Sequence, residues 1–366
     1  MKKSVFILSF VSLIFASCSS NDDNSGVSPE PSVEGAVMKP NVGGPNEPNQ
    51  VFVDLSANQQ KAVQRDTWDL GFATGSDFRV IINGSVKMAV KQLNTTNIDE
   101  VQQDDSSVAV GFTTMADLGY VDNPTGILTG NGAGEGTAIA EISATAADNK
   151  VYLVNMGFEV GTETPEAGSV AVDGEARGWK KIRITRDGSD YVVDYADLAD
   201  TTHKTVKVSK KADFNFTFLN LTSGQIVDVQ PAKKQWDLAF SGFTNYYPSG
   251  DSEITYYFSD FISSNILGGT KVYMVTSSSE EAAAEYEAFT KANVDETQFA
   301  ASTTDQRIIG DTWREGGSRT ASPSIHDDRF YVVKDADGNL FKIRFLALLN
   351  DAGERGNPVF EYELLK

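Results

Sequence analysis

Two similar stretches of sequence decide the fold. Residues 51–72 read VFVDLSANQQKAVQRDTWDLGF, and residues 216–240 read FTFLNLTSGQIVDVQPAKKQWDLAF. Both run from an alternating strand pattern through a polar turn to Trp-Asp-Leu, followed by Gly or Ala and then Phe. Alternation along a strand puts the tryptophan and the leucine on one face and the aspartate on the other. We therefore expect a core strand in which Asp69 or Asp237 is a polar anchor, bonded to a turn amide or an arginine, rather than a ligand contact.

Later features recur in the same order after each of these stretches. The recurring pairs are 151–154 with 330–333, 181–183 with 342–344, and 191–195 with 358–362. A shared order over this length indicates a duplication. We predict two tandem β domains, at residues 51–209 and 210–366, each large enough to bury its own core.

The rest of the folded part has the composition of strands and turns. Short alternating apolar runs are separated by Gly, Asn, Asp and Ser, which is typical of antiparallel strands. We predict an all-β fold of antiparallel sheets with one minor helix at 280–292, where Ala282, Tyr286 and Phe289 share one face. We interpret residues 335–339 as a hairpin turn. A calcium loop is the alternative, but the EF-hand pattern is not completed.

Charge and the scarcity of cysteine and histidine exclude several classes of function. The chain has 366 residues, with 31 Lys and Arg against 51 Asp and Glu, a net charge of −20. Such a chain repels phosphate backbones and anionic membrane surfaces, so we expect no nucleic-acid partner. One cysteine excludes a disulfide framework, a Cys-rich zinc site and an iron–sulfur cluster. Two histidines leave little room for a multi-histidine metal centre.

The first 50 residues have the sequence of a targeting signal followed by a linker. Lys2 and Lys3 precede a nearly unbroken apolar run of 12 residues that ends at Ala16. This run is too short to span a membrane but suits a signal-peptide core. It ends in Phe-Ala-Ser-Cys, which looks like the cleavage site of a lipoprotein, so we expect a signal peptide at 1–17 and acylation of Cys18. Residues 18–50 are polar and rich in proline, and we expect a flexible linker that leaves the lipid as the only membrane contact.

No catalytic motif is present in the sequence. It lacks a Gly-x-Ser-x-Gly elbow, a His-Glu-x-x-His pair and a Gly-x-x-x-x-Gly-Lys-Ser/Thr loop. Paired-carboxylate chemistry would show only in the geometry. Lipid-anchored β domains suit binding better than catalysis, and we do not expect an enzyme.

The second domain resembles the HmuY family of haem-binding lipoproteins. The resemblance covers nearly all of residues 214–366 and is carried by the stretches 236–240, 257–262, 269–273, 309–314 and 328–333. The first domain is similar to a more divergent copy. It keeps residues 68–72 and 181–183 but lacks the Tyr-Phe-Ser-Asp-Phe stretch.

The resemblance implies an all-β lipoprotein on the outer membrane or the cell surface. Members of the family take haem from haemoproteins and pass it to a TonB-dependent outer-membrane receptor. They hold the iron with two axial side chains, which are histidines in some members and methionines in others. We therefore expect a haemophore-like protein of iron acquisition with haem as its cofactor. The alternative is a haem-independent surface lipoprotein that binds a protein or a glycan.

The axial ligands of the family do not map onto this chain residue by residue. Haem iron commonly takes His or Met, and the candidates are His203, His326, Met88, Met115 and Met274. The histidines fall near the ends of the two predicted domains, and solvated surface histidine is the alternative for both. Met88 and Met115 lie in less regular stretches, whereas Met274 lies in a strand-like run where a core role is the default.

Four tyrosines are a separate group of candidates. They are Tyr246, Tyr247, Tyr256 and Tyr257. A phenolate can bind ferric haem, and aromatic faces line haem slots. Clustered tyrosines are also normal on sheet surfaces, and we favour that interpretation over ligation.

Overall fold

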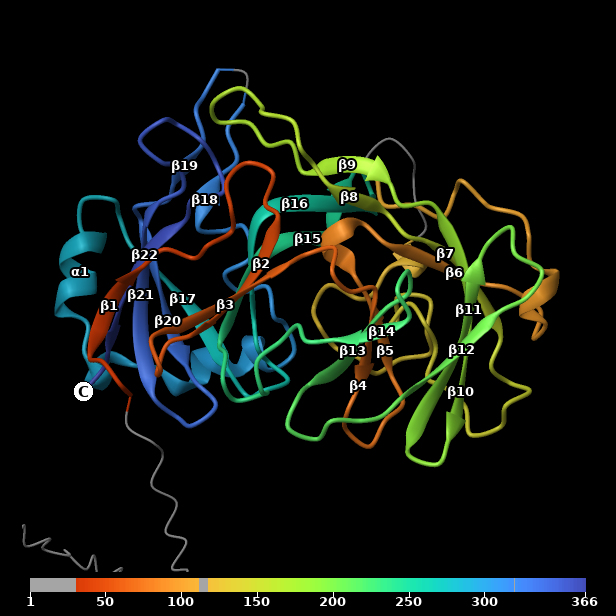
Figure 1. Cartoon of the computed structure of the whole chain (residues 1–366). Helices are drawn as coiled ribbons and strands as arrows, with labels where there is room; N and C mark the ends of the chain where they lie inside the picture. The colour runs from red at the N-terminus through yellow and green to blue at the C-terminus, as the bar shows by residue number, and fades with distance from the viewer. Residues whose placement is uncertain (1–30, 112–117, 319) are drawn as a thin grey trace, which may run out of the picture.

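Four antiparallel sheets make up most of the molecule and stand in a row (Figure 1). The structure is a computed structural model that describes residues 31–111, 118–318 and 320–366. We number the sheets I to IV along the row. The predicted all-β class with little helix is confirmed.

The four sheets contain eighteen of the strands. Sheet I has the order β1 (Gly35–Met38), β22 (Val359–Leu364), β21 (Leu340–Ala347), β20 (Arg329–Lys334) and β17 (Lys271–Thr276). Sheet II has the order β16 (Ser252–Ser264), β15 (Leu238–Ser249), β2 (Asn49–Asp54) and β3 (Gln59–Gln64). Sheet III has the order β14 (Gln225–Val227), β13 (Phe216–Asn220), β4 (Leu70–Ala73) and β5 (Val80–Ile82). Sheet IV has the order β12 (Lys204–Val208), β11 (Asp190–Asp197), β10 (Trp179–Asp187), β7 (Val151–Asn155) and β6 (Ala89–Gln92).

Short elements complete the described structure. Two small ribbons pair β8 (Phe158–Val160) with β9 (Asp173–Ala176) and β18 (Arg314–Glu315) with β19 (Ser324–Ile325). The one α-helix is α1 (Ala282–Ala288), and the 3₁₀ turns are η1 (Gly84–Val86), η2 (Ile98–Glu100), η3 (Leu118–Tyr120), η4 (Lys291–Asn293) and η5 (Glu296–Thr303). No helix among the described residues is long and apolar enough to cross a membrane.

Three layers of core separate the four sheets. Between sheets I and II, Val53 and Phe240 pack among Val333 and Phe341. Sheets III and IV enclose a matching core that includes Leu70, Leu219, Ile182 and Val193. The opposite faces of sheets II and III meet in a third cluster, which we call the junction cluster: Phe52, Trp68, Ala73, Phe216, Phe218, Val229, Trp236 and Ala239. The row of sheets is therefore two β-sandwiches joined back to back.

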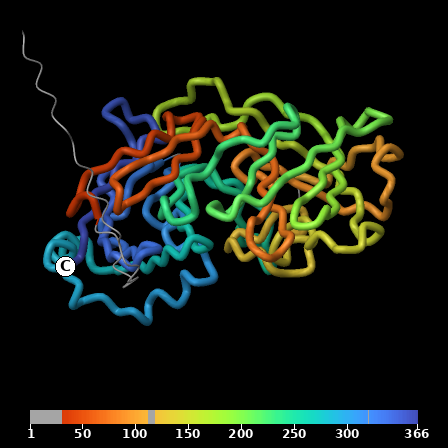
Figure 2. Tube along the Cα trace, turned by 60° about the horizontal axis from the view of Figure 1, so that its bottom comes forward, coloured from red at the N-terminus to blue at the C-terminus, as the bar shows by residue number. Residues whose placement is uncertain are grey.

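Each repeat contributes a hairpin to the sandwich formed mainly by the other repeat. The β2–β3 hairpin of the first repeat joins sheet II, where Val53 lies opposite Leu238. The β13–β14 hairpin of the second repeat joins sheet III, where Leu219 lies opposite Leu70. Figure 2 shows the red and orange N-terminal segment lying along the blue C-terminal half. The ranges 51–209 and 210–366 thus stay a prediction about the sequence repeats, because each sandwich contains strands of both.

The two Trp-Asp-Leu aspartates fix these exchanged hairpins. The Asp237 carboxylate accepts a hydrogen bond of 3.0 Å from the amide of Leu55, at the turn of the first hairpin. The Asp69 carboxylate accepts the matching bond of 2.6 Å from Leu221, and the Arg177 guanidinium lies 2.6 Å from it. Burial raises the pKa of both carboxyls, that of Asp237 to about 7. The expected polar anchor on a turn amide or an arginine is confirmed. The expected shared face of tryptophan and leucine is wrong, because Trp68 and Trp236 lie in the junction cluster whereas Leu70 and Leu238 lie in the cores of the two sandwiches.

The predicted flexible linker extends too far along the chain. Residues 35–38 form β1, which pairs with β22 from Gly35 opposite Glu363 to Met38 opposite Phe360. Met38 and Val42 are buried in the core between sheets I and II. The linker prediction over 18–50 is therefore wrong for residues 35–42. Hydrogen bonds between β1 and β22 and burial in the core order this segment in spite of its polar, proline-rich composition.

Two smaller predictions are confirmed. Ala282, Tyr286 and Phe289 are buried on one face of α1 and its end, although α1 is shorter than the predicted 280–292. The turn at 335–339 joins β20 to β21, and the Asp335 carboxylate accepts bonds from the amides of Asp337 and Asn339. Among the described residues, no group of acidic, histidine or cysteine side chains has the arrangement of a metal site.

Candidate functional site

Two hollow regions lie where the two sandwiches meet. The first, the junction cavity, has a volume of about 160 Å³ and lies beside the junction cluster. The second, the junction cleft, has a volume of about 440 Å³ and lies beside residues 256–259 of β16. Ligand pockets commonly measure about 300–1,000 Å³, so only the cleft has the size of an ordinary ligand site.

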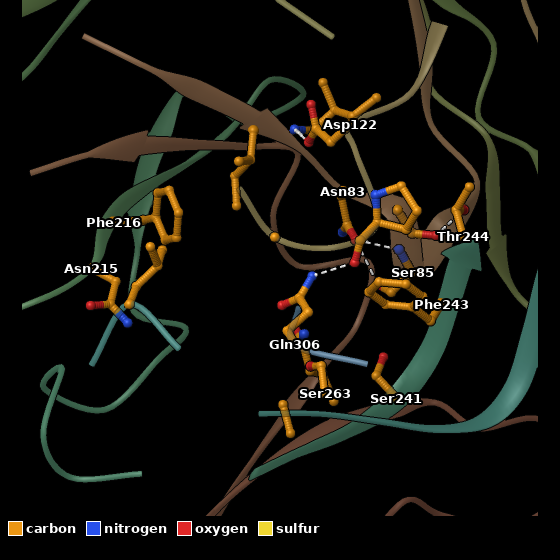
Figure 3. A pocket seen from close by; sticks show the side chains of 18 of the residues that line it. Asn83, Ser85, Asp122, Asn215, Phe216, Ser241, Phe243, Thr244, Ser263 and Gln306 are labelled. Atoms are coloured by element: carbon orange, nitrogen blue, oxygen red, sulfur yellow. Dashed lines mark hydrogen bonds between the residues drawn. The ribbon is translucent and has the colours of Figure 1, made fainter. Parts of the chain in front are cut away.

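The junction cavity is lined by rings and amides from both repeats. Figure 3 shows Phe216 and Asn215 on one side, Phe243 and Thr244 on the other, and Gln306 between them. The Gln306 amide donates to the carbonyl of Pro124 at 3.0 Å, which ties a loop of the second repeat to a loop of the first.

Asp122 is the one ionisable side chain among the described residues that line the cavity. Its carboxyl oxygens each accept a backbone hydrogen bond of 2.8 Å, from Ile82 and from Ala138. Burial raises the pKa of Asp122 to about 7. The cavity therefore offers no cation and no second acid to a ligand.

The junction cleft combines aromatic rings with cations. From the first repeat, the lining residues are Lys87, Val110, Gly111, Val170 and Val172. From the second repeat, the lining residues are Tyr256, Tyr257, Phe258, Ser259, Arg314, Gly316, Gly317 and Arg355. The Lys87 ammonium lies 4.7 Å from the centroid of the Tyr257 ring and pairs with Asp173, outside the lining. Among the described lining residues there are three cations and no carboxylate, on a chain with a net charge of −20.

A buried ionic cluster forms the floor of the cleft. Both Nε and Nη2 of Arg355 donate to Oδ2 of Asp260, at 2.8 and 2.5 Å. The Asp260 amide donates to Oε1 of Glu47 at 2.8 Å, while the other Glu47 oxygen has no hydrogen-bond partner. Burial, reinforced by Asp260, raises the pKa of Glu47 to about 8. The guanidinium groups of Arg314 and Arg355 thus face Asp260, and the raised pKa of Glu47 favours its neutral form.

Two details show that this cluster is not an ordinary structural ion pair. The Arg314 side chain is 8% exposed, and its Nε makes no hydrogen bond and lies 3.9 Å from Asp260 Oδ2. Glu47 and Asp260 both adopt left-handed backbone, with φ of 45° and 50°, which is uncommon for residues other than glycine. Backbone outliers and unpaired buried groups concentrate at functional sites.

The candidate histidines lie in separate sandwiches. His203 precedes β12, and its Nδ1 lies 3.0 Å from Asp99 and its Nε2 3.8 Å from Asp194. His326 follows β19, with its Nε2 3.2 Å from Glu315. Neither histidine lines the cavity or the cleft.

Met274 and His326 reach the same loop from two sides. The Thr312 hydroxyl lies 3.9 Å from the Met274 sulfur, which is on the edge strand β17. The His326 amide donates to the carbonyl of Trp313 at 2.9 Å. This loop continues through Arg314 and Gly316 into the lining of the cleft. Of the four candidates that the structure describes, these two are the pair that it brings to one neighbourhood.

The other candidates have different surroundings. Met88 is fully buried in the core between sheets III and IV and touches the junction cavity. Met115 and Cys18 lie outside the described residues. Among the four tyrosines, Tyr256 and Tyr257 line the cleft, and the Tyr257 hydroxyl donates to the carbonyl of Ser85 at 3.2 Å. Burial raises the pKa of Tyr257, which disfavours a phenolate.

Sequence reasoning missed the charged floor of the cleft. Glu47 was assigned to the linker, and Arg355 stands in a polar loop without a motif. Asp260 and Arg314 do lie in two of the stretches that carry the family resemblance, 257–262 and 309–314. These two stretches were the available signal for the cluster. The residue type gave none, because a sequence does not distinguish a buried arginine from an exposed one.

The fold defines a two-repeat β-sandwich protein whose cavity and cleft lie where the two repeats meet. A family model described as HmuY protein matches residues 46–216 and again residues 212–362. The chain therefore belongs to the HmuY family, in two tandem copies, as the resemblance predicted.

Solved structures give weaker likenesses. An apo HmuY analogue from Tannerella forsythia is 9% identical, over 91% of this chain and 95% of that one, with a TM-score of 0.23. A Bacteroides vulgatus protein described as HmuY-like and haem-binding is 12% identical, over 92% and 95%, with a TM-score of 0.20. A Bacteroides fragilis protein described as a lipoprotein is 15% identical, over 49% and 91%, with a TM-score of 0.22. A search of curated proteins finds no match. Family membership therefore rests on the family model.

Proposed function

We propose that this protein is a haem-binding lipoprotein that holds haem in the junction cleft. The observation that carries the proposal is the lining of the cleft, which joins three cations to aromatic rings and contains no carboxylate among its described residues. Haem is a flat, apolar macrocycle with two carboxylates. The rings of Tyr256 and Phe258 suit the macrocycle, and Arg314 and Arg355 suit the carboxylates, because guanidinium groups bind carboxylates strongly.

Membership of the HmuY family supports haem as the ligand. The junction cavity does not suit haem, since it is too small and its described lining has no cation. Met274 and His326 are the axial-ligand candidates that contact residues 312 and 313, in the loop that leads into the cleft lining. Met115 stays a candidate from the sequence alone.

The cellular part of the proposal rests on the sequence. The apolar run that ends at Ala16 and the single cysteine support cleavage before Cys18 and a lipid anchor. The anchor would hold the protein at the outer membrane, exposed at the cell surface. The family supports transfer of haem to a TonB-dependent receptor, a binding role rather than a catalytic one.

Haem titration of cleft variants tests the site. In the soluble chain that starts after Cys18, we expect Tyr256→Ala to weaken haem binding about tenfold, because a lost ring contact costs roughly 1 kcal/mol or more. Tyr247→Ala is the matched control, since Tyr247 is similarly exposed but does not line the cleft. Arg314→Gln should weaken binding at least tenfold. If Tyr256→Ala and Arg314→Gln bound haem as tightly as the Tyr247→Ala control, haem would bind outside the cleft.

Spectra of the haem complex test the axial ligands. A low-spin Soret spectrum in the wild type indicates two strong axial ligands. We expect Met274→Ala or His326→Ala to change that spectrum while the melting temperature stays within a few degrees. Unchanged spectra in both variants would exclude these two residues as ligands.

A further inference from the structure

The junction cavity is a second and smaller hollow region that haem does not explain. Its volume of about 160 Å³ resembles that of an engineered protein cavity of about 150 Å³ that binds benzene. Six aromatic residues line it: Phe52, Trp68, Phe216, Trp236, Phe243 and Phe261. The size and the rings suit a molecule with one or two small aromatic rings.

Polar atoms at the same cavity lack partners. Three of its lining residues, Gln230, Trp236 and Ser241, have a buried side-chain atom without a hydrogen bond: the Gln230 Oε1, the Trp236 Nε1 and the Ser241 Oγ. Trp236 and Ser241 are 6% and 8% exposed. An unpaired buried polar group destabilises the folded protein, so a bound molecule that pairs with one of them recovers part of that cost.

The equivalent tryptophan of the first repeat shows what is missing. The Trp68 Nε1 donates to Oε1 of Gln50 at 3.3 Å. Leu55 and Leu221 make equivalent bonds to the two aspartates, so the position that corresponds to Gln50 in the second repeat is Phe216, whose side chain has no acceptor. The unpaired indole of Trp236 is therefore a departure from the symmetry of the two repeats, at the wall of the cavity.

Charge limits the ligand to a neutral molecule. Asp122 is the one ionisable residue in the described lining, and both of its oxygens already accept backbone bonds. An anion would find no cation there, and a cation would find no free carboxylate oxygen. We propose that the junction cavity binds a small neutral aromatic molecule with a hydrogen-bonding group, of about the size of phenol or indole.

Calorimetric titration with phenol and benzene tests this proposal on the whole soluble chain. We expect saturable phenol binding, with benzene at least threefold weaker because it pairs with no polar atom. Ser263→Leu should abolish phenol binding, since Ser263 lines the cavity and a leucine would occupy it. Ser252→Leu is the matched control at the exposed start of the same strand, and it should bind phenol like the wild type.

A second variant tests the proposal without adding a larger side chain that could disturb the fold. Ser241→Ala keeps the volume and removes one unpaired hydroxyl, so it should weaken phenol about threefold and leave benzene unchanged. Absence of phenol binding by the wild type would mean that the cavity holds only water and would overturn the proposal. Phenol binding that survives Ser263→Leu would place the molecule elsewhere and overturn it as well. Haem titration of Ser263→Leu separates the two sites, because it should bind haem like the wild type.

Discussion

The indole ring of Trp68 packs edge-to-face on the ring of Phe218, with the ring centroids 4.8 Å apart. Trp68 belongs to the first repeat and Phe218 to the second. The reverse pair, Trp236 with Phe52, has the same geometry at 5.1 Å. Each Trp-Asp-Leu segment thus holds the hairpin of the other repeat twice, once through its tryptophan ring and once through its aspartate. The two repeats complete one another, and the cavity and the cleft lie where they do so.

Removing the two anchoring carboxylates should destabilise the protein to different extents. Asp237→Ala leaves the buried amide of Leu55 unpaired, which costs about 1–3 kcal/mol. Asp69→Ala also leaves the Arg177 guanidinium buried without its partner, so we expect a larger loss of about 3–5 kcal/mol. Urea unfolding measures both. Asp228→Ala, at an exposed ion pair with Lys61, is the control and should stay within about 0.5 kcal/mol of wild type. Similar values for all three would refute the anchoring role.

Cutting the chain between residues 209 and 210 should give two fragments that do not fold alone. Fragment 31–209 lacks the β13–β14 hairpin, which pairs with β4, and fragment 210–366 lacks β1 and the β2–β3 hairpin. We expect cooperative unfolding, followed by tryptophan fluorescence, only after the fragments are mixed. A cooperative transition in either isolated fragment would contradict the hairpin exchange.

The strand β1 predicts a contrast between two neighbouring residues. Met38 is buried between sheets I and II, so Met38→Ala should cost about 2–4 kcal/mol. Val37 is 58% exposed, and Val37→Ala should cost little. Denaturant unfolding of both variants decides the matter. Equal and small losses of unfolding free energy in both variants would support the flexible linker predicted from the sequence.

Glu47 should make stability fall as the pH rises. Its folded pKa of about 8 lies above the ordinary value of 4.5. The folded state therefore holds a proton that the unfolded state loses, and this contribution is complete below pH 4.5 and is lost as the pH rises to about 8. Glu47→Gln keeps the acceptor for the Asp260 amide and has no proton to lose. We expect a flatter dependence of the unfolding free energy on pH in that window. Parallel curves for the variant and the wild type would contradict the protonated state.

Local patterns explain why much of the fold could be predicted. The Trp-Asp-Leu strands, the turn at 335–339 and the apolar face of α1 depend on neighbours in the sequence, and all three are present. The hairpin exchange could not be predicted, because Val51 to Val53 would alternate in the same way in either sheet. The linker failed for a similar reason, since what orders β1 is the distant strand β22.

The candidate site was less accessible to sequence reasoning. Glu47, Asp260, Arg314 and Arg355 come from four distant segments, and their charge is informative only once burial is known. The histidines looked suitable by residue type, yet His203 and His326 each pair with carboxylates in a separate sandwich. The family resemblance indicated haem as the ligand to expect, whereas the place proposed for it depends on how the two repeats meet at the junction.

The number of haem molecules bound per chain tests the central claim most directly. Lys87 of the first repeat and Arg314 of the second line one cleft, so the proposed function requires that the two repeats together bind one haem. We expect a Soret titration of the soluble chain to saturate at one equivalent of haem, with a single affinity. Saturation at two equivalents would show that each repeat binds haem by itself, and the absence of a saturable Soret change would show that this member of the family does not bind haem.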